Sequence, residues 1–314
     1  AMGKKVVVFG SFVVDLTSFS GGLPLPGQTI LGESFKMGAG GKGSNQAVAA
    51  HRAGADVTLI TKIGPDVFGR VALDFYEKEG MDTRYILTDE SRETGVALIM
   101  VDQESAQNEI VVVSGACGNI TAEDMERVRP VIEGADVLLV QLEVNFDALF
   151  RAIEIAHGAG ATIVLNPAPA AELPDALLRK VDVVTPNETE AQALTGVRVE
   201  TGEDALRSAR VFLDKGVRAV VITLGAAGAF ATDGGEYVLL PRIPVKAVDA
   251  TGAGDAFNGG FAMALAEGKD LFTAARYGNV AGALSVTRPG TAPSMPRRSE
   301  IDALFGAVYG PDGG

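Results

Sequence analysis

The order of apolar segments along the chain limits its fold more than any other feature. Short runs of Val, Ile and Leu, such as Lys5–Gly10 (KVVVFG), alternate with longer segments whose apolar residues recur at helical spacing. A continuous apolar run is typical of a strand buried on both faces, and repeated strand–helix alternation favours βαβ units. We therefore predict an α/β fold in which helices cover both faces of a mostly parallel central sheet.

The periodicity also gives the expected elements. The predicted strands are Lys5–Gly10, Asp56–Thr61, Asp136–Gln141, Ala161–Asn166, Val181–Thr185 and Val217–Leu224. The predicted helices are Ser44–Ala53, Asp66–Glu79, Thr121–Ile132, Phe146–His157, Glu188–Leu194, Glu203–Lys215 and Ala256–Glu267, with another from Asp270. A length of 314 residues is sufficient for a full α/β core, and no linker or repeat interrupts the pattern. We expect a single domain over residues 1–314.

Two stretches break the alternation. Ser11–Met37 is rich in Gly and Pro, and Thr94–Ser114 contains two apolar runs around a polar turn, which predicts a β-hairpin. Residues from about 11–37 and 94–114 could together form a small β-sheet separate from the core. Such a sheet beside a glycine-rich loop would be suited to act as a lid. The alternative is an antiparallel extension of the core sheet.

The charge and composition exclude several kinds of partner. A formal net charge of −13 repels nucleic acid and anionic lipid, so we expect neither as a partner. A phosphate group must then be held locally, by backbone amides, a few cations and a metal ion. No apolar run reaches about 18 residues, and the start of the chain lacks a secretory pattern. The single cysteine, Cys117, cannot form an internal disulfide, which fits a cytoplasmic protein.

The glycine-rich segment Gly38–Asn45 (GAGGKGSN) contains the G-x-G-x-x-G pattern of dinucleotide-binding proteins. That pattern carries its meaning only directly after the first strand of a βαβ unit, whereas the opening strand Lys5–Gly10 ends almost 30 residues earlier. Lys42 is followed by Gly43, so the segment is not a Walker loop either. Lys42 and Asn45 can instead donate hydrogen bonds to hydroxyl oxygens. A structural turn that packs the next helix is the alternative.

The segment Asp249–Asn258 (DATGAGDAFN) predicts an anion site at a helix N-terminus. Its residues Gly252, Ala253 and Gly254 would present successive amides, which bind phosphate through their N–H groups and the helix dipole. A carboxylate beside this site, Asp255, would oppose phosphate binding unless it has a chemical task, although a helix N-cap would need no further explanation. Phosphoryl transfer supplies the task, because a base must accept the proton of the attacking hydroxyl.

Two further segments are candidates for ligand contact. Thr223–Gly228 (TLGAAG) follows a predicted strand and would reach the crevice at the carboxyl ends of the strands, although a plain turn explains it equally well. Asn187 and Glu190 of the NETE segment lie three residues apart at a helix start and share a face. That spacing suits the water shell of a hard cation, and it also suits a capping box.

These motifs occur together in one family. The segments GGKGSNQA, NETE and GAGDAFNGGF appear in the order found in the ribokinases, the phosphofructokinase-B-like sugar kinases, and the chain resembles that family from about Lys5 to Phe305. The segments LNPAPAAELP, TPNETEAQALTG and VTRPGTAPS resemble the ribokinase branch in particular. The resemblance implies a Rossmann-like core with a β-sheet lid, a homodimer joined through the lids, a small-molecule sugar substrate, and ATP, Mg²⁺ and an activating K⁺ ion.

The resemblance also implies roles for individual residues. Asp255 would be the base, with Gly252, Ala253 and Gly254 as the anion hole. The sugar would be held by Asp15, Gly41, Lys42, Asn45 and Glu143. The nucleotide would be lined by Thr223, Gly225, Gly228, Gly254 and Asn279, with Asn187 and Glu190 serving the phosphates and, through water, Mg²⁺. The monovalent cation would lie at Asp249, Thr251, Ser285, Arg288, Gly290 and Ser294, bound largely through carbonyl oxygens.

One residue departs from the ribokinase pattern. Ribokinases normally carry a sugar-binding asparagine where the segment Gly10–Asp15 (GSFVVD) has Val13, and 2-deoxyribose kinases of the family carry an apolar residue there. An apolar pocket rejects an added hydroxyl by only about 10²-fold. We therefore predict good use of 2-deoxyribose without exclusion of ribose. A nucleoside kinase or a kinase of another sugar with the same fold is the main alternative, followed by an oxidoreductase and a non-catalytic sugar-binding protein.

Overall fold

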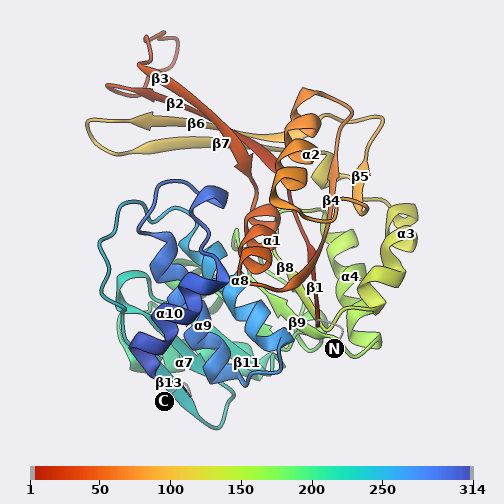
Figure 1. The fold of residues 1–314 in the computed structure, drawn as a ribbon, viewed down its shortest axis with the longest axis vertical. Helices are drawn as coiled ribbons and strands as arrows, with labels where there is room; N and C mark the ends of the chain where they lie inside the picture. The colour runs from red at the N-terminus through yellow and green to blue at the C-terminus, as the bar shows by residue number, and fades with distance from the viewer. Residues whose placement is uncertain (1–3, 312–314) are drawn as a thin grey trace.

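A nine-stranded sheet forms the centre of the molecule (Figure 1). The structure is a computed structural model that describes residues 4–311. The strand order is β13-β12-β11-β10-β9-β8-β1-β4-β5, and only β12 and β13 are antiparallel to their neighbours. The strands are β1 (Lys5–Phe9), β4 (Asp56–Ile63), β5 (Ile86–Thr88), β8 (Val137–Val140), β9 (Thr162–Leu165), β10 (Val183–Val184), β11 (Ala219–Thr223), β12 (Ala229–Thr232) and β13 (Tyr237–Leu240).

The predicted α/β fold with a mostly parallel sheet is confirmed. All six predicted strands are present, and the central ones are buried on both faces: Val6, Val7, Val8 and Phe9 are each 0% exposed. The strands that the sequence analysis did not predict, β5, β12 and β13, lie at the two edges of the sheet and have three or four residues each. Runs this short leave too little periodicity to be distinguished from loops.

Helices cover both faces of the sheet. They are α1 (Lys42–Arg52), α2 (Val67–Glu79), α3 (Ala122–Glu133), α4 (Phe146–Gly158), α5 (Asp175–Leu178), α6 (Glu188–Thr195), α7 (Gly202–Asp214), α8 (Ala253–Ala266), α9 (Leu271–Ser285) and α10 (Arg298–Tyr309), with short 3₁₀ turns at Ala116–Gly118, Gly225–Ala227 and Ala292–Ser294. The connections through α1 and α4 run in opposite directions along the sheet, so right-handed crossovers place them on opposite faces. In the described part of the chain, no helix combines the length and the apolar character needed to cross a lipid bilayer.

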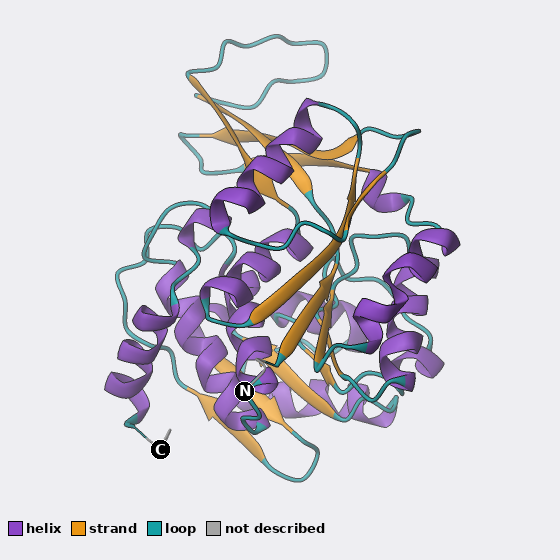
Figure 2. Ribbon diagram, turned by 45° about the vertical axis from the view of Figure 1, so that its right-hand side comes forward, coloured by secondary structure: helices purple, strands orange, loops and turns teal. Residues whose placement is uncertain are grey.

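A second, smaller sheet stands apart from the core, at the top of Figures 1 and 2. Its four strands, in the order β3-β2-β6-β7, are β2 (Val13–Ser20), β3 (Ser34–Gly40), β6 (Thr94–Asp102) and β7 (Asn108–Gly115). The predicted separate sheet is therefore confirmed, and the alternative of an extension of the core sheet is wrong. The glycine-rich segment Gly38–Asn45 is largely regular structure and not a loop. Strand β3 ends with its first three residues, and helix α1 begins with its last four.

The register of the small sheet sorts its side chains onto two faces. Asp15 pairs with Ala97, and Ala97 with Val112, so these three residues share one face. Leu16, Leu98 and Val111 are paired in the same way on the opposite face. Because side chains alternate along a strand, Val13 lies on the face of Asp15. The small sheet thus has one face that carries the predicted sugar-binding residues and a second, apolar face.

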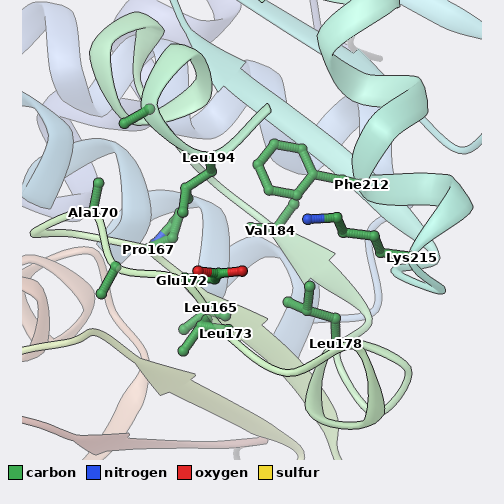
Figure 3. Close-up of a pocket in the computed structure, with 12 residues that line it drawn as sticks. Leu165, Pro167, Ala170, Glu172, Leu173, Leu178, Val184, Leu194, Phe212 and Lys215 are labelled. Atoms are coloured by element: carbon green, nitrogen blue, oxygen red, sulfur yellow. The ribbon is translucent and has the colours of Figure 1, made fainter. Parts of the chain in front are cut away.

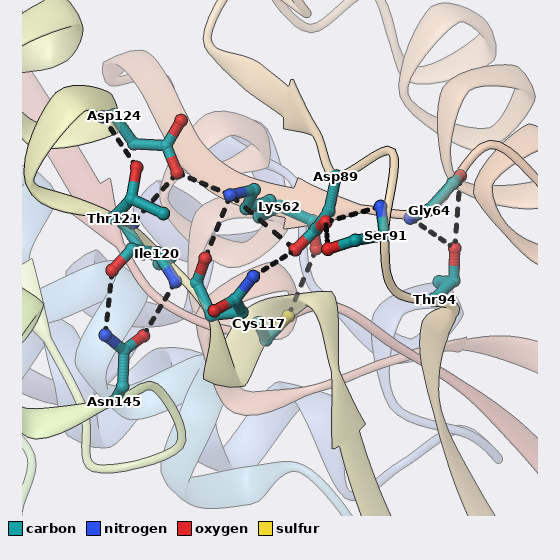
Figure 4. Close-up of polar contacts among 11 residues, drawn as sticks. Lys62, Gly64, Asp89, Ser91, Thr94, Cys117, Ile120, Thr121, Asp124 and Asn145 are labelled. Carbon is teal, nitrogen blue, oxygen red and sulfur yellow. Dashed lines mark hydrogen bonds and ion pairs between the residues drawn. The ribbon is translucent and has the colours of Figure 1, made fainter.

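Buried polar contacts fix the base of the small sheet to the core (Figure 4). Lys62, on β4, is 4% exposed, and its Nζ lies 2.9 Å from the Asn119 carbonyl oxygen, 2.5 Å from Asp124 Oδ2 and 3.7 Å from Asp89 Oδ2. Burial would raise the pKa of Asp89, but hydrogen bonds from Asn119 and Ser91 and the charge of Lys62 lower it to about 2. The segments that enter β6 and leave β7 are therefore tied to one buried ammonium group.

A second contact fixes the first residue of β6. Thr94 donates its backbone N–H to Asp66 Oδ2 at 2.8 Å and its hydroxyl to Asp66 Oδ1 at 2.7 Å, while Gly64 N donates to Thr94 Oγ1 at 2.9 Å. Asp66 also caps helix α2 by accepting a hydrogen bond from Gly69 N at 2.9 Å. One carboxylate therefore joins the start of α2 to the start of β6.

Candidate active site

The site lies where the strand order of the core reverses. The chain passes from β1 to β4 on one side and later from β8 to β9 on the other, so the carboxyl ends of β1 and β8 border a crevice. Glu143 follows β8, and its Oε1 accepts hydrogen bonds from Ser11 Oγ, after β1, and from Lys42 N, both at 2.7 Å. A Cβ atom at Gly43 would lie 2.4 Å from Ser11 N, so only glycine lets α1 pack this closely.

Asp255 lies in the first turn of α8, directly across from α1. It is 8% exposed, and it accepts hydrogen bonds from Asn45 Nδ2 at 3.1 Å and from Gln46 Nε2 at 3.0 Å. The N-cap of α8 is Gly252, which has a φ of 81°, and no side chain caps this helix end. The N-cap interpretation of Asp255 is therefore wrong, since its carboxylate bonds to another helix and not to its own first turn.

The charges around Asp255 are closely coupled. Burial raises the pKa of Asp255, whereas Lys42 and the two amide donors oppose that rise. Burial lowers the pKa of Lys42, but the charges of Asp255, Glu143 and Glu190 outweigh it, so the net pKa of Lys42 is raised. Lys42 thus stays an ammonium group among carboxylates, within reach of a ligand that carries negative charge.

Asp15, on β2 of the small sheet, faces the same site. Burial, together with the charges of Glu143 and Asp255, raises its pKa from 3.8 to about 6. A cavity of about 330 Å³ adjoins this region. It is lined by Ser11, Val13, Val112, Ser114, Gly118, Leu142, Glu143, Val144, Asn145 and Pro169. A lining that combines a carboxylate, an amide and two hydroxyls with several apolar side chains suits a small polyhydroxy compound that has an apolar edge.

A second cavity, of about 160 Å³, surrounds the N-terminus of α8. Its lining includes Lys42, Asn166, Asn187, Glu190, Gly252, Ala253, Gly254 and Asp255. A Cβ atom at Gly254 would meet open space, so the backbone here is accessible to a ligand. The three amides predicted to be free are not equivalent, because Ala253 N already donates to the Ala250 carbonyl oxygen at 3.2 Å. The dipole of the 14-residue helix still favours an anion at this position.

A larger cavity of about 470 Å³ continues from the second one. Both are lined by Asn187, Thr223, Ala250, Ala253 and Gly254. The larger cavity adds Gly225, Gly228 and Asn279 to the predicted residues and has an apolar wall of Ile243, Val245, Phe257 and Val286. Gly228 also has a structural reason to be glycine, since a Cβ atom would lie 2.0 Å from the Leu240 carbonyl oxygen. A ligand could place a flat apolar group in this larger cavity and an attached anionic group in the cavity beside Asp255.

Asn187 and Glu190 form the predicted capping box of α6. Glu190 N donates to Asn187 Oδ1 at 2.8 Å, and Asn187 N donates to Glu190 Oε1 at 3.1 Å. Burial raises the pKa of Glu190, against the opposing charge of Lys42. The capping box does not prevent these two residues from contacting a ligand, because both also line the cavity at Asp255.

The two segments expected to bind a monovalent cation lie side by side. Asp249 accepts hydrogen bonds from Thr251 N and from Gly290 N, both at 2.9 Å. The hydroxyls of Ser285 and Ser294 donate to nearby carbonyl oxygens, those of Gly282 and Thr291, and Arg288 pairs with Glu300 at 3.1 Å. Among residues 4–311, no group of three or more His, Cys, Asp or Glu side chains could hold a metal ion. A cation here would need backbone oxygens as ligands.

A set of buried polar residues behind Asp255 was not predicted from the sequence. They are Gln46, Gln141, Asn166, Thr185 and Asn258, each at most 7% exposed. Three of them directly follow apolar strands, in VLLVQ, TIVLN and VVT. A polar residue at the carboxyl end of several strands in succession is the signal that could have identified them.

A further cavity lies away from these residues (Figure 3). It measures about 280 Å³ and is lined mainly by apolar residues, from the segment 167–173 and from β9, β10, α5, α6 and α7. Glu172 and Lys215 are the charged residues of this lining. None of the predicted site residues contributes to it. The candidate chemistry is therefore confined to the crevice at Asp255.

Comparison with known proteins agrees with this geometry. The model of the pfkB family carbohydrate kinases matches residues 3–298. The chain is 42% identical to the ribokinase of Haemophilus influenzae over 95% of the chain and 97% of that protein, and 37% identical to the deoxyribokinase of Salmonella typhi over 93% and 95%. The structure of Arabidopsis thaliana ribokinase complexed with ribose and ATP superposes with a TM-score of 0.88, at 30% identity over 97% of this chain and 99% of that one. The chain belongs to the pfkB family of carbohydrate kinases.

Proposed function

We propose that this protein is an ATP-dependent pentose kinase that transfers the γ-phosphoryl group of ATP to the 5-hydroxyl of D-ribose, 2-deoxy-D-ribose or both. The observation that carries the proposal is the position of Asp255. This buried carboxylate lies at the N-terminus of α8, beside an anion cavity that continues into a larger, partly apolar one. Some relatives are named ribokinase and others deoxyribokinase, which supports a pentose as the sugar substrate.

The sugar-binding residues are proposed from their positions around this carboxylate. Asp15, Lys42, Asn45 and Glu143 would accept or donate hydrogen bonds to the sugar hydroxyls, with Gly41 allowing close approach at the start of α1. Asp255 would accept the proton of the attacking hydroxyl. The amides of the first turn of α8 and Lys42 would stabilise the charge of the transferring group.

The proposed ions fit the donor groups of the site. Glu190, with Asn187, would hold Mg²⁺ through water, since residues 4–311 contain no group of three or more acidic, His or Cys side chains that could surround the ion directly. Bound Mg²⁺ would neutralise phosphate charge during transfer. K⁺ would lie between Asp249, Thr251, Ser285, Arg288, Gly290 and Ser294, held chiefly by their carbonyl oxygens. The paired segments at Asp249 and Gly290 would keep that loop in place beside α8.

The small sheet would act as a lid over the sugar. Its inner face carries Val13, Asp15 and Val112, which approach the core residue Glu143. Movement beyond the fixed base at Lys62 and Thr94 would bring this face down on a bound sugar. Closure would exclude water, which limits hydrolysis of ATP in the absence of sugar transfer.

Replacement of Asp255 by asparagine is expected to lower kcat by about 10²- to 10⁴-fold, because the amide cannot accept the proton. Sugar and ATP dissociation constants should change little, which isothermal calorimetry would measure alongside steady-state kinetics. Asp270→Asn is the matched control, since Asp270 is the N-cap of α9, accepts a hydrogen bond from Thr273 N and lines none of the cavities at the site. Near-normal turnover by Asp255→Asn would show that Asp255 is not the base.

Asp15→Asn is expected to stabilise the protein while it weakens sugar binding. The folded-state pKa of Asp15 is raised to about 6, so ionisation of Asp15 destabilises the fold at any pH above its ordinary pKa of 3.8. Below its ordinary pKa of 3.8, Asp15 is neutral in both the folded and the unfolded protein. The loss of folding stability caused by its ionisation therefore grows from pH 4 to pH 6 and reaches about 3 kcal/mol. Thermal melts should show the variant more stable at pH 8, with the difference shrinking at pH 5. A difference that does not depend on pH would contradict the assigned environment.

Val13 is proposed to set the choice between ribose and 2-deoxyribose. It is 7% exposed, lines the cavity next to Glu143, and has no polar atom in its side chain. A site that hydrogen-bonds a hydroxyl can reject the analogue lacking it by about 10⁴-fold, whereas an apolar site rejects the added hydroxyl by about 10²-fold. The wild-type site should accordingly use 2-deoxyribose well and still accept ribose.

The test compares kcat/KM for D-ribose and 2-deoxy-D-ribose in wild type and Val13→Asn, with ATP, Mg²⁺ and K⁺. Wild type should prefer 2-deoxyribose, and Val13→Asn should shift the ratio toward ribose by about 10-fold or more. Leu142→Asn, in the same cavity wall, tests whether any added amide has this effect. Equal or better use of ribose by wild type, with no change in Val13→Asn, would refute the role of Val13. Activity on nucleosides alone would favour a nucleoside kinase.

A homodimer joined through the small sheets is proposed from the apolar character of its outer face. Phe35, Met37, Leu98 and Val111 on this face are 66%, 50%, 47% and 59% exposed. Contiguous apolar residues exposed on a sheet usually mark a protein interface. A second copy of the same sheet would cover them symmetrically and would hold the two lids together.

Leu98→Lys is expected to dissociate that dimer, because it would bury an unpaired ammonium group in an apolar contact. Sedimentation equilibrium should give twice the mass of one chain for wild type and the mass of one chain for the variant. Leu239→Lys is the matched control, since Leu239 is 50% exposed on β13 at the far edge of the core. A wild type that sediments as a monomer at micromolar concentration would rule out the lid dimer.

A further inference from the structure

The polar residues behind Asp255 form a connected chain of hydrogen bonds. Gln141 Nε2 donates to Gln46 Oε1 at 2.6 Å, and Gln46 Nε2 donates both to Asp255 Oδ1 and to Asn166 Oδ1, at 3.0 Å each. Asn166 Nδ2 donates onward to the Thr185 carbonyl oxygen at 2.8 Å. Gln46 and Gln141 are 0% exposed, so water does not compete for these bonds.

The direction of donation in this chain is fixed by its two ends. An ionised Asp255 and the Thr185 carbonyl can only accept hydrogen bonds. Asn166 must therefore turn its NH₂ group toward Thr185 and its oxygen toward Gln46. The NH₂ group of Gln46 then serves Asn166 and Asp255, which leaves its oxygen to accept from Gln141. Both polar atoms of the Gln46 side chain therefore take part in hydrogen bonds. While Asp255 is ionised, only this arrangement of donors and acceptors gives each of these atoms a partner.

From this geometry we infer that Gln46 is a positioning residue that keeps Asp255 ionised and oriented for proton acceptance. The inference rests on the proposed kinase function, since it concerns the same carboxylate. Gln46 does not line any of the cavities at the site. It reaches the site through the two residues to which it donates, Asp255 and Asn166, and Asp255 is the ionisable one of the two. A polarised donor chain strengthens each bond in it.

The other charges that face Asp255 do not make Gln46 redundant. Lys42 favours the ionised form, and Glu143, Asp15 and Glu190 oppose it. Asn45 supplies a second donor, but its Oδ1 is buried without a partner, so it is not held by a chain of its own. Gln46 is the donor whose orientation the core fixes.

The test replaces Gln46 by Met, which is similar in length and cannot donate a hydrogen bond. Single-turnover phosphoryl transfer, measured from pH 5 to pH 9 with saturating ATP and sugar, should be slower at the acidic end of this range, by up to about 10-fold. Its acidic limb should move upward by about one pH unit, because the ionised form of Asp255 loses a donor. The rate should recover toward the wild-type value at pH 9, with the sugar dissociation constant changed less than about threefold.

Two further variants separate positioning from packing. Gln46→Glu keeps the shape of the side chain but must share a proton with Asp255, so it should move the acidic limb in the same direction. Tyr76→Phe removes the buried hydrogen bond from Tyr76 to Ser44 Oγ at 2.5 Å, on the same helix as Gln46, without touching Asp255. It should lower the melting temperature and leave the acidic limb unmoved. Equal slowing of Gln46→Met at every pH, or a similar limb shift in Tyr76→Phe, would overturn the inference.

A direct titration distinguishes a failure of this inference from a failure of the proposed function. In protein labelled with ¹³C at the aspartate carboxyl carbon, the signal lost in Asp255→Asn identifies Asp255. Its midpoint should rise by about one unit in Gln46→Met, whether or not any pentose is phosphorylated. An unchanged midpoint would refute the role of Gln46. A shifted midpoint in a protein inactive on pentoses would refute only the assigned substrate.

Discussion

The burial of one carboxylate, Asp255, is the constraint on which the rest of the site depends. An ionised group out of water is costly unless hydrogen bonds and opposite charge replace its hydration. Here the replacement comes from a different helix, because Asn45, Gln46 and Lys42 all lie on α1. Helices α1 and α8 must therefore pack unusually closely. Gly259 makes this possible, since a Cβ atom there would lie 2.3 Å from the Ala49 side chain.

The same carboxylate ties the small sheet to the chemistry of the core. Burial raises the pKa of Asp15 on the sheet to about 6, and the charges of Glu143 and Asp255 in the core add to that rise, because the three groups repel one another when all are ionised. If the small sheet acts as the proposed lid, this repulsion would favour its open position in the absence of ligand. A sugar placed between these groups offers hydroxyl donors to each of them and relieves the repulsion. Ligand binding and closure of the sheet would then be favoured by one electrostatic change.

The sequence predicted the core well and the details of the site less well. Runs such as KVVVF and VLLV are buried on both faces, so their apolar character directly reflects a parallel sheet. The partners of Asp255 could not be predicted in the same way, because Asn45 and Asp255 are separated by 210 residues and meet only through the packing of α1 on α8. The capping position of Gly252 was also missed, since a carboxylate near a helix start resembles an N-cap in sequence.

The glycine motifs of this chain reflect packing as much as chemistry. Gly43 is required for contact with Ser11, and Gly259 for contact with α1, whether or not a sugar is bound. Such motifs reflect how α1 and α8 are brought together in this chain, and they cannot distinguish one sugar from another. Substrate choice must come from positions that the packing leaves free. Val13, proposed for this role, begins β2, and its side chain borders the cavity beside Glu143, so a polar residue there would change the lining of that cavity.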